Sequence, residues 1–334
     1  MSGLRIIFMG TPELAGVCLA ALLREPAFSV GAVVTQPDRP KGRDLKLQPS
    51  PVKQIALRAG LPVLQPEKAR DEHLLRELQR LQPELIAVAA FGQILPKSLL
   101  ELPRFGCLNV HTSLLPKYRG AAPIQWAILN GETETGVTIM KMDPGLDTGD
   151  ILTQSTTPIT ATDNSQTLHD RLAQLGAELL VHTIQDYVAG KIQPRAQEAG
   201  AASHAPKIKK DDGRIDWSLP ARAIWNRIRA FTPWPGAFTF LPGATTAGAA
   251  GTLSNPPGTE ETPKPLRLLK IWEAEVVPVN GPPGVILSAG KTGIVVGCGR
   301  EALRIATLQR EGGRRMSAVE FLAGHVLAPG ASLG

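Results

Sequence analysis

The chain has 334 residues, 43% of them hydrophobic and 20% charged, which is the balance of a soluble globular protein long enough for two domains. The three cysteines, Cys18, Cys107 and Cys298, lie far apart, which excludes paired-cysteine zinc sites and a disulfide framework and indicates a reducing cytoplasm. No apolar run approaches the ~20 residues of a membrane span, and the N-terminus enters a strand without a signal segment. We therefore expect a cytoplasmic protein that does not contact a membrane.

Strands and helices alternate in the first part of the chain. Short apolar runs predict buried strands, and apolar residues at helical spacing predict helices. The expected strands are 4–9, 30–35, 85–90, 107–111 and 137–142, and the expected helices are 14–22, 52–58, 72–82, 120–130 and 164–190. This order predicts an α/β domain over residues 1–190 with a Rossmann-like, doubly wound, mostly parallel sheet. The first turn, 10–13, lacks the G-x-G-x-x-G pattern, which disfavours a dinucleotide.

The connection at 36–50 is longer than most loops in compact domains. It carries the four basic residues Arg39, Lys41, Arg43 and Lys46. It also follows the second strand, on the side of the sheet where α/β proteins bind ligands. A solvated loop without a ligand is the alternative interpretation.

The second part of the chain has a different pattern. Residues 191–206 show no periodicity and are expected to be a linker. In residues 207–334, a helix at 221–229 is followed by short β-type runs with Gly and Pro turns, which predict a small barrel. These runs are 237–241, 266–276, 285–287, 293–296 and 303–307, and residues 242–265 are predicted to be a surface insertion.

The positive charge of the chain lies in this second part. From Lys207 onward there are 16 Lys and Arg against 10 Asp and Glu, and this excess of +6 equals that of the whole chain. Such asymmetry favours an acidic partner, of which nucleic acid is the commonest. A basic domain without such a partner would have the same charge.

Asn109 and His111 end a predicted buried strand. They are two residues apart, so their side chains leave the same face of an extended strand. The carboxamide can donate to a carbonyl oxygen, and the imidazole can exchange a proton near neutral pH. A single His at a strand end is more often structural, but Asn109 together with the following run 113–116 and Arg119-Gly120 favours catalysis. Asp147, in the glycine-punctuated turn 143–150, is its candidate partner, whereas Cys107 is interpreted as a packing residue.

Asn109, His111, the run 113–116 and Asp147 within Gly145-Leu146-Asp147-Thr148-Gly149 resemble the signature of the folate-dependent formyltransferase family. The resemblance covers nearly the whole chain, including 9–12 and 233–236. It implies transfer of a formyl group from 10-formyltetrahydrofolate as co-substrate, without a metal, by Asn109, His111 and Asp147. On spacing alone, the segment 91–96 could also be an ordinary connection from a strand to a helix instead of part of a ligand pocket. The residues expected at the folate are Phe91, Gly92, Ile94, Leu95, Ser113, Leu114, Leu115, Pro116, Asp143 and Gly145.

The Asn, His and Asp set does not by itself identify the acceptor. The basic loop at 41–46 and the basic C-terminal part favour RNA as the acceptor. The resemblance implies formylation of the α-amine of methionine on initiator tRNA, with an oligonucleotide-fold-like barrel at 207–334 as tRNA-binding domain. We expect a monomer, although the sequence itself does not determine the oligomeric state. Formylation of an amino-sugar nucleotide, hydrolysis of formyl-folate and non-catalytic RNA binding are the alternatives. The presence of all three site residues argues against the last. The residues expected at tRNA are Lys41, Arg43, Lys46, Lys207, Lys209 and Lys210.

Overall fold

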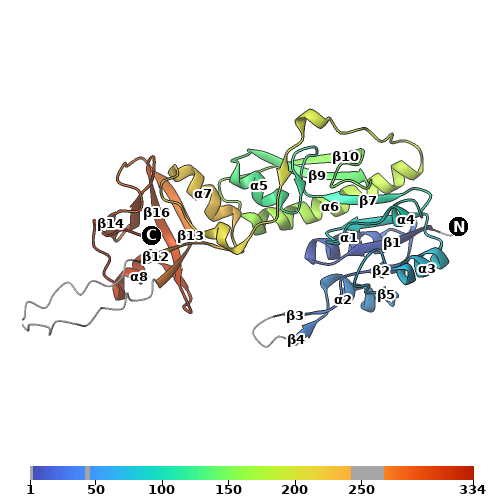
Figure 1. The fold of residues 1–334 in the computed structure, drawn as a ribbon, viewed down its shortest axis with the longest axis horizontal. Coiled ribbons are helices and arrows are strands. Elements are labelled where there is room, and N and C mark those ends of the chain that lie inside the picture. The colour runs from blue at the N-terminus through green and yellow to red at the C-terminus, as the bar shows by residue number, and fades with distance from the viewer. Residues whose placement is uncertain (1–2, 42–45, 242–266) are drawn as a thin grey trace, which may run out of the picture. The chain divides into compact units, whose positions relative to one another are not determined.

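The computed structural model describes residues 3–41, 46–241 and 267–334, which form two compact units (Figure 1). The first unit comprises residues 1–127 and 132–207, and the second comprises 128–131 and 208–334. Each unit has its own hydrophobic core. The predicted insertion at 242–265 lies outside the described residues. Among the helices that are described, none combines the length and apolar character needed to cross a membrane.

The first unit is built on a seven-stranded sheet with the order β10-β9-β7-β6-β1-β2-β5. The five strands from β5 to β7 in this order are parallel, whereas β9 and β10 run antiparallel to their neighbours. The mostly parallel α/β sheet expected from the sequence is therefore confirmed. The strands are β1 (Leu4–Gly10), β2 (Phe28–Val34), β5 (Val63–Leu64), β6 (Leu85–Ala89), β7 (Cys107–His111), β9 (Glu134–Lys141) and β10 (Ile151–Pro158).

Helices cover both faces of this sheet. Leu78 of α3 and Leu99 of α4 join a buried cluster on one face, together with Ile86 and Cys107 of the sheet. On the other face α6 packs against α1 and approaches β7 closely, because a Cβ on Gly176 would lie 2.8 Å from Val110 Cγ1. The helices of this unit are α1 (Glu13–Arg24), α2 (Pro51–Arg58), α3 (Glu72–Leu81), α4 (Lys97–Leu100), α5 (Pro123–Leu129), α6 (Ser165–Val188) and the 3₁₀ turn Ala199–Ala201.

Two segments differ from the expectation. The long connection at 36–50 contains a two-stranded antiparallel hairpin formed by β3 (Arg39–Lys41) and β4 (Lys46–Gln48). Residues 191–206, expected to be a linker, lie along the first unit. There β11 (His204–Ala205) pairs with β8 (Arg119–Gly120), and Arg195 exchanges two backbone hydrogen bonds with Ile151. Strands this short leave no periodicity in the sequence, which is why they were not predicted.

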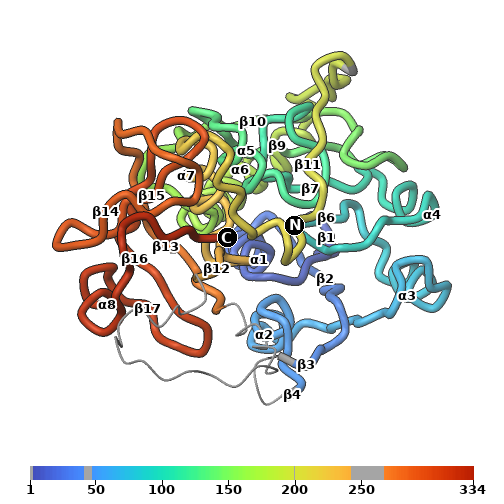
Figure 2. Tube along the Cα trace, turned by 60° about the vertical axis from the view of Figure 1, so that its left-hand side comes forward, coloured from blue at the N-terminus to red at the C-terminus, as the bar shows by residue number. Residues whose placement is uncertain are grey.

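The second unit is an antiparallel sheet with the order β12-β13-β16-β15-β14, and β17 pairs with β16. α7 packs on β13, and α8 lies beside β16 and β17 (Figure 2). The short strands expected here are confirmed and pair antiparallel, although β17 and α8 were not predicted. The elements are the 3₁₀ turn Lys210–Gly213, α7 (Ala221–Ala230), β12 (Ala237–Leu241), β13 (Arg267–Val277), β14 (Ile286–Gly290), β15 (Gly293–Gly297), β16 (Ala302–Arg310), β17 (Arg315–Ser317) and α8 (Ala318–Gly324).

The segment 331–334 connects the two edges of this sheet. Gly334 exchanges two backbone hydrogen bonds with Phe240 of β12, at 2.9 and 3.1 Å. On its other side, the Ile286 N–H of β14 donates to the Ala331 carbonyl at 2.8 Å. The Leu333 side chain meanwhile enters the core of the unit. The segment therefore closes the described part of the sheet into a barrel and covers the edges of β12 and β14 at that seam.

Replacing Leu333 with alanine is expected to lower the free energy of unfolding by about 2–3 kcal/mol, because its side chain is 4% exposed and leaves a cavity in the core. Urea unfolding of the intact chain, followed by tryptophan fluorescence, measures the change. Val326, at 96% exposure, is the matched control, and Val326→Ala should shift the value by less than about 0.5 kcal/mol. Equal effects at the two positions would contradict closure by this segment.

Candidate active site

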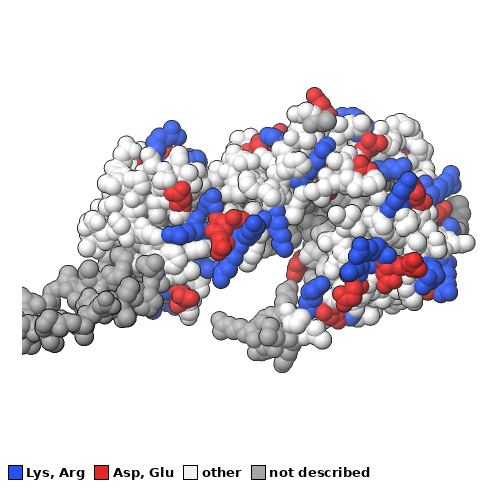
Figure 3. Space-filling model, in the orientation of Figure 1, with Lys and Arg blue, Asp and Glu red and all other residues white. Residues whose placement is uncertain are grey.

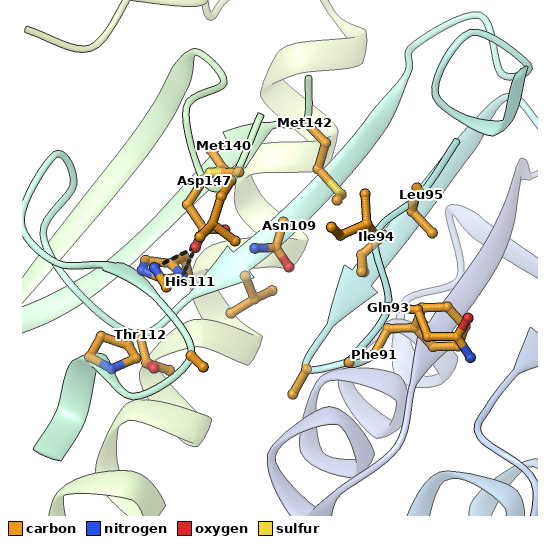
Figure 4. A pocket seen from close by; sticks show the side chains of 18 of the residues that line it. Phe91, Gln93, Ile94, Leu95, Asn109, His111, Thr112, Met140, Met142 and Asp147 are labelled. Carbon is orange, nitrogen blue, oxygen red and sulfur yellow. Dashed lines mark hydrogen bonds and ion pairs between the residues drawn. The ribbon is translucent and has the colours of Figure 1, made fainter. Parts of the chain in front are cut away.

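A cavity of about 480 Å³ opens in the first unit where β6 and β7 end and the chain turns after β9 (Figure 4). Ligands of open parallel sheets bind at this edge. Its lining is largely apolar, with a few polar side chains. The lining residues are Leu14, Val88, Ala90, Phe91, Gly92, Gln93, Ile94, Leu95, Asn109, Val110, His111, Thr112, Gly120, Ala121, Pro123, Met140, Met142, Asp143, Gly145, Leu146 and Asp147.

Asn109 and His111 reach this cavity from β7. The strand alternation turns both side chains away from α6, whose Gly176 meets the intervening Val110 on the other face. Figure 4 shows the Asn109 carboxamide between His111 and Ile94. Among the described residues it has no hydrogen-bond partner, so its N–H groups are free to donate to a ligand.

The His111 ring is held by a main-chain carbonyl. His111 is 6% exposed, and its Nε2 lies 2.7 Å from the carbonyl oxygen of Tyr118. A carbonyl oxygen only accepts, so Nε2 carries a proton. In the neutral ring Nδ1 is then the unprotonated nitrogen. Nδ1 lies 3.8 Å from Asp147 Oδ2, within ion-pair range but longer than a hydrogen bond (Figure 4).

Ser113 holds the Tyr118 carbonyl in place. Its hydroxyl donates to the Tyr118 oxygen at 3.1 Å and accepts the Tyr118 N–H at 2.9 Å. Leu115 is fixed nearby, because its N–H donates to Thr138 Oγ1 at 3.0 Å. The four residues Ser113, Leu114, Leu115 and Pro116, expected at the folate, are not among those that line the cavity. They support the loop that orients His111, because their hydrogen bonds are made to neighbouring chain.

Asp147 sits on a tightly constrained turn. Asp143 organises this turn, because its carboxylate accepts hydrogen bonds from the Gly145 N–H and the Thr148 hydroxyl. Gly149 is required at its end, because a Cβ there would lie 1.9 Å from the carbonyl oxygen of Lys141. Asp147 itself has a left-handed backbone with φ +52°, and its Oδ2 accepts the Gly120 N–H at 2.8 Å. The carboxylate is thereby aimed at His111.

The remaining residues expected at the folate do line the cavity. They are Phe91, Gly92, Ile94, Leu95, Asp143 and Gly145. Phe91 and Leu95 are buried in its wall, whereas Ile94 is 80% exposed at its mouth. Sequence reasoning missed Gln93, Met140, Met142 and Leu146. The alternation along β9 could have placed Met140 on this side, but Leu146 lies in an irregular turn without such a signal.

Cys107 shares the strand face of Asn109 but lies deeper. Its Sγ donates to the Leu99 carbonyl at 3.5 Å, and burial raises the pKa of its thiol to about 12. The thiol therefore stays protonated at neutral pH and is a poor nucleophile. Within the described ranges, His, Cys, Asp and Glu side chains form no group of three that could hold a metal ion.

The basic residues expected at tRNA are only partly described. Lys207, Lys209 and Lys210 are exposed. The backbone of Lys41 and Lys46 lies in β3 and β4, whereas Arg43 lies outside the described residues. On the face shown in Figure 3, the Lys and Arg side chains that are drawn lie among Asp and Glu side chains. The distribution of charged side chains on that face therefore does not by itself outline a binding surface for tRNA.

Family models account for most of the chain. Residues 4–184 match the model described as formyl transferase, and residues 207–326 match the model described as formyl transferase, C-terminal domain. The chain belongs to the formyl transferase family.

Relatives that share about half of the sequence carry a more particular name. The methionyl-tRNA formyltransferase of Citrifermentans bemidjiense is 50% identical over 334 residues, which cover 100% of this chain and 98% of the relative. The methionyl-tRNA formyltransferase of Caldanaerobacter subterraneus is 49% identical over 333 residues, which cover 99% and 100%.

Solved structures with lower identity share the fold. The N-formyltransferase of Helicobacter canadensis in complex with folinic acid and dTDP-3-aminofucose superposes with a TM-score of 0.62 at 19% identity, covering 90% of this chain and 99% of the other. HypX of Aquifex aeolicus in complex with tetrahydrofolic acid gives 0.60 at 17% identity, covering 96% and 47%.

Proposed function

We propose that this protein is an enzyme that transfers the formyl group of 10-formyltetrahydrofolate to the α-amine of methionine carried on initiator tRNA. One observation carries the proposal: Asn109, His111 and Asp147 meet at a cavity of small-molecule size at the edge of the parallel sheet. The full-length similarity to proteins named methionyl-tRNA formyltransferase supports the choice of acceptor.

The cavity has the volume and lining that suit a folate. About 480 Å³ lies within the usual range of ligand pockets, about 300–1,000 Å³. Phe91, Leu95 and Met140 supply apolar wall for a ring system, and Asp143 and Asn109 supply polar groups. The co-substrate brings the formyl carbon that is transferred. In this proposal six residues hold the folate, namely Phe91, Gly92, Ile94, Leu95, Asp143 and Gly145.

Asn109 and His111 perform different parts of the reaction. When the amine forms its bond to the formyl carbon, negative charge develops on the formyl oxygen and positive charge on the amine nitrogen. The Asn109 carboxamide donates to that oxygen, and one such donor contributes about 10²–10³ in rate. As the bond to the folate nitrogen breaks, the amine loses a proton and the folate nitrogen gains one.

His111 and Asp147 serve this proton movement. Because Tyr118 holds the proton on Nε2, Nδ1 is the atom that can accept one. The Asp147 carboxylate, 3.8 Å away, compensates the positive charge of the protonated ring. The pair therefore places a proton acceptor beside a carboxylate inside the cavity.

The tRNA contacts in this proposal are electrostatic. Six basic side chains neutralise phosphates, which positions RNA without reading its sequence. They are Lys41, Arg43, Lys46, Lys207, Lys209 and Lys210. The excess of +6 from Lys207 onward favours the same partner. The proposal places the enzyme in the cytoplasm as a monomer, and light scattering of the purified protein tests its oligomeric state.

The decisive experiment offers the purified protein 10-formyltetrahydrofolate with three acceptors: initiator methionyl-tRNA, free methionine and a nucleotide-linked amino sugar. Selective formylation of the charged tRNA is the expected result. Formylation of the sugar would reassign the acceptor, and release of formate alone would indicate hydrolysis. No turnover of the folate with any acceptor would refute the proposed role of Asn109, His111 and Asp147.

Replacing Ile94 with serine is expected to raise the KM for 10-formyltetrahydrofolate about tenfold and to change kcat less. Burial of an isoleucine side chain contributes about 1.5 kcal/mol or more, and about 1.4 kcal/mol corresponds to a factor of ten. Steady-state kinetics at saturating tRNA measure the effect. The matched control is the same replacement at Leu57 on α2, because Leu57 is exposed and does not line the cavity. An unchanged KM would remove Ile94 from the folate site.

A further inference from the structure

A glutamine in the segment 191–206 binds the turn that carries Asp147. The Gln197 Nε2 donates to the main-chain carbonyl of Asp147 at 2.8 Å and to that of Gly149 at 2.7 Å. Its Oε1 accepts two hydrogen bonds from the Arg119 guanidinium, at 3.1 and 2.9 Å. Both amide hydrogens and the carbonyl oxygen of this carboxamide are therefore engaged.

These contacts join the two pieces of backbone that fix the Asp147 carboxylate. The turn holds Asp147 through its main chain, and the neighbouring Gly120 N–H donates to Asp147 Oδ2. Gln197 contacts the turn with its nitrogen and the Arg119 side chain, next to Gly120, with its oxygen. One side chain therefore sets the turn against the strand whose N–H orients the carboxylate.

The turn requires such support from outside. Asp147 adopts a left-handed backbone, with φ +52°, which is uncommon for a residue with a side chain, and although aspartate tolerates it better than most residues, contacts from its surroundings help to hold it. The 3.8 Å separation between His111 Nδ1 and Asp147 Oδ2 depends on this conformation. Displacements of about 1 Å at a reacting group can cost about 10²-fold in rate.

We infer that Gln197 is a positioning residue for Asp147 in the reaction. It does not line the cavity, so it acts through the turn and has no contact of its own with the substrate. The kinetic tests of this inference rest on the proposed function, because they measure the rate of that reaction. The competing interpretation is that Gln197 only anchors residues 191–206 to the first unit.

Four variants separate the two interpretations: Gln197→Ala, Gln197→Glu, Asp147→Asn and Gln197→Ala combined with Asp147→Asn. Gln197→Ala is expected to lower kcat about 10–100-fold with both KM values within about twofold. In the Asp147→Asn background it should lower kcat by less than about twofold more, because residues that act through one group are not additive. Gln193→Ala, at an exposed position of the same segment, is the matched control and should behave like the unaltered protein.

Gln197→Glu tests the direction of the hydrogen bonds. Glutamate retains an acceptor for Arg119 but cannot donate to the Asp147 and Gly149 carbonyls. If Gln197 positions Asp147, this variant should be as slow as Gln197→Ala. If it only anchors the segment through Arg119, the variant should retain the full rate, which would overturn the inference. Additive losses in the double variant would overturn it as well.

A second measurement needs no formyl acceptor. The NMR signals of the His111 ring, recorded at one pH, report the surroundings of that ring. They are expected to shift in Gln197→Ala and in Asp147→Asn and to stay unchanged in Gln193→Ala. Unchanged His111 signals in Gln197→Ala refute the positioning role, even if the protein formylates another acceptor. Absence of formyl transfer by the unaltered protein would instead refute the proposed function alone.

Discussion

Replacement of His111 by alanine is expected to lower kcat for formyl transfer by about 10²–10⁴-fold, the usual contribution of a positioned proton-transfer group. The variant lacks the Nδ1 atom that faces Asp147, so the cavity loses its proton acceptor. Affinity for tRNA should stay within about threefold, because phosphate contacts supply most of that binding. Single-turnover kinetics and a filter-binding titration measure the two quantities.

Two controls show whether the fall in kcat comes from the chemical step or from a disturbed fold. His182→Ala changes an exposed histidine on α6 and should leave kcat unaltered. The Tyr118 carbonyl keeps a partner in His111→Ala, because Ser113 still donates to it, so the loop should remain folded by circular dichroism. A large fall in tRNA affinity with a small fall in kcat would contradict the division between chemistry and binding.

Replacement of Asn109 by alanine is the second large effect, a loss of about 10²–10³-fold in kcat. The carboxamide has no hydrogen-bond partner among the described residues, so its removal leaves no protein group unsatisfied. KM for the folate should change little, because the hydrogen bond strengthens as charge develops on the formyl oxygen. Rapid-quench measurement of the chemical step gives the value directly.

Asn109→Asp is the shape-matched comparison for this prediction. An ionised aspartate has nearly the same size but donates no hydrogen bond and repels a developing oxyanion. It should therefore be at least as slow as Asn109→Ala. An aspartate variant with near-normal kcat would show that the site needs the volume of Asn109, and the donor role would have to be abandoned.

Much of the fold follows from local patterns in the sequence. The buried strands β6 and β7 are apolar runs bounded by turns, so their existence and bounds could be predicted. The edge strand β10 could not, because it has one strand partner and its sequence is rich in Thr and Ser. The short pairing of β8 with β11 depends on contacts between residues about 85 positions apart, a distance that no local pattern encodes.

The same division applies to the candidate site. Alternation along one strand places Asn109 and His111 on a common face, and the glycine-rich turn marks Asp147, so these candidate site residues could be chosen from the sequence. The groups that orient these side chains could not be predicted from the sequence. The Tyr118 carbonyl and the Gly120 N–H are main-chain atoms, which every residue supplies, so only their position in space distinguishes them.

The sequence by itself indicated the α/β class, the charge asymmetry and the three candidate site residues, because residue type, spacing and the resemblance to the formyltransferase signature carry that information. The tertiary structure decided which proton His111 keeps, how Asp147 is held and that residues 191–206 belong to the first unit. Those properties arise from hydrogen bonds between distant segments. Their geometry exists only once the chain has folded.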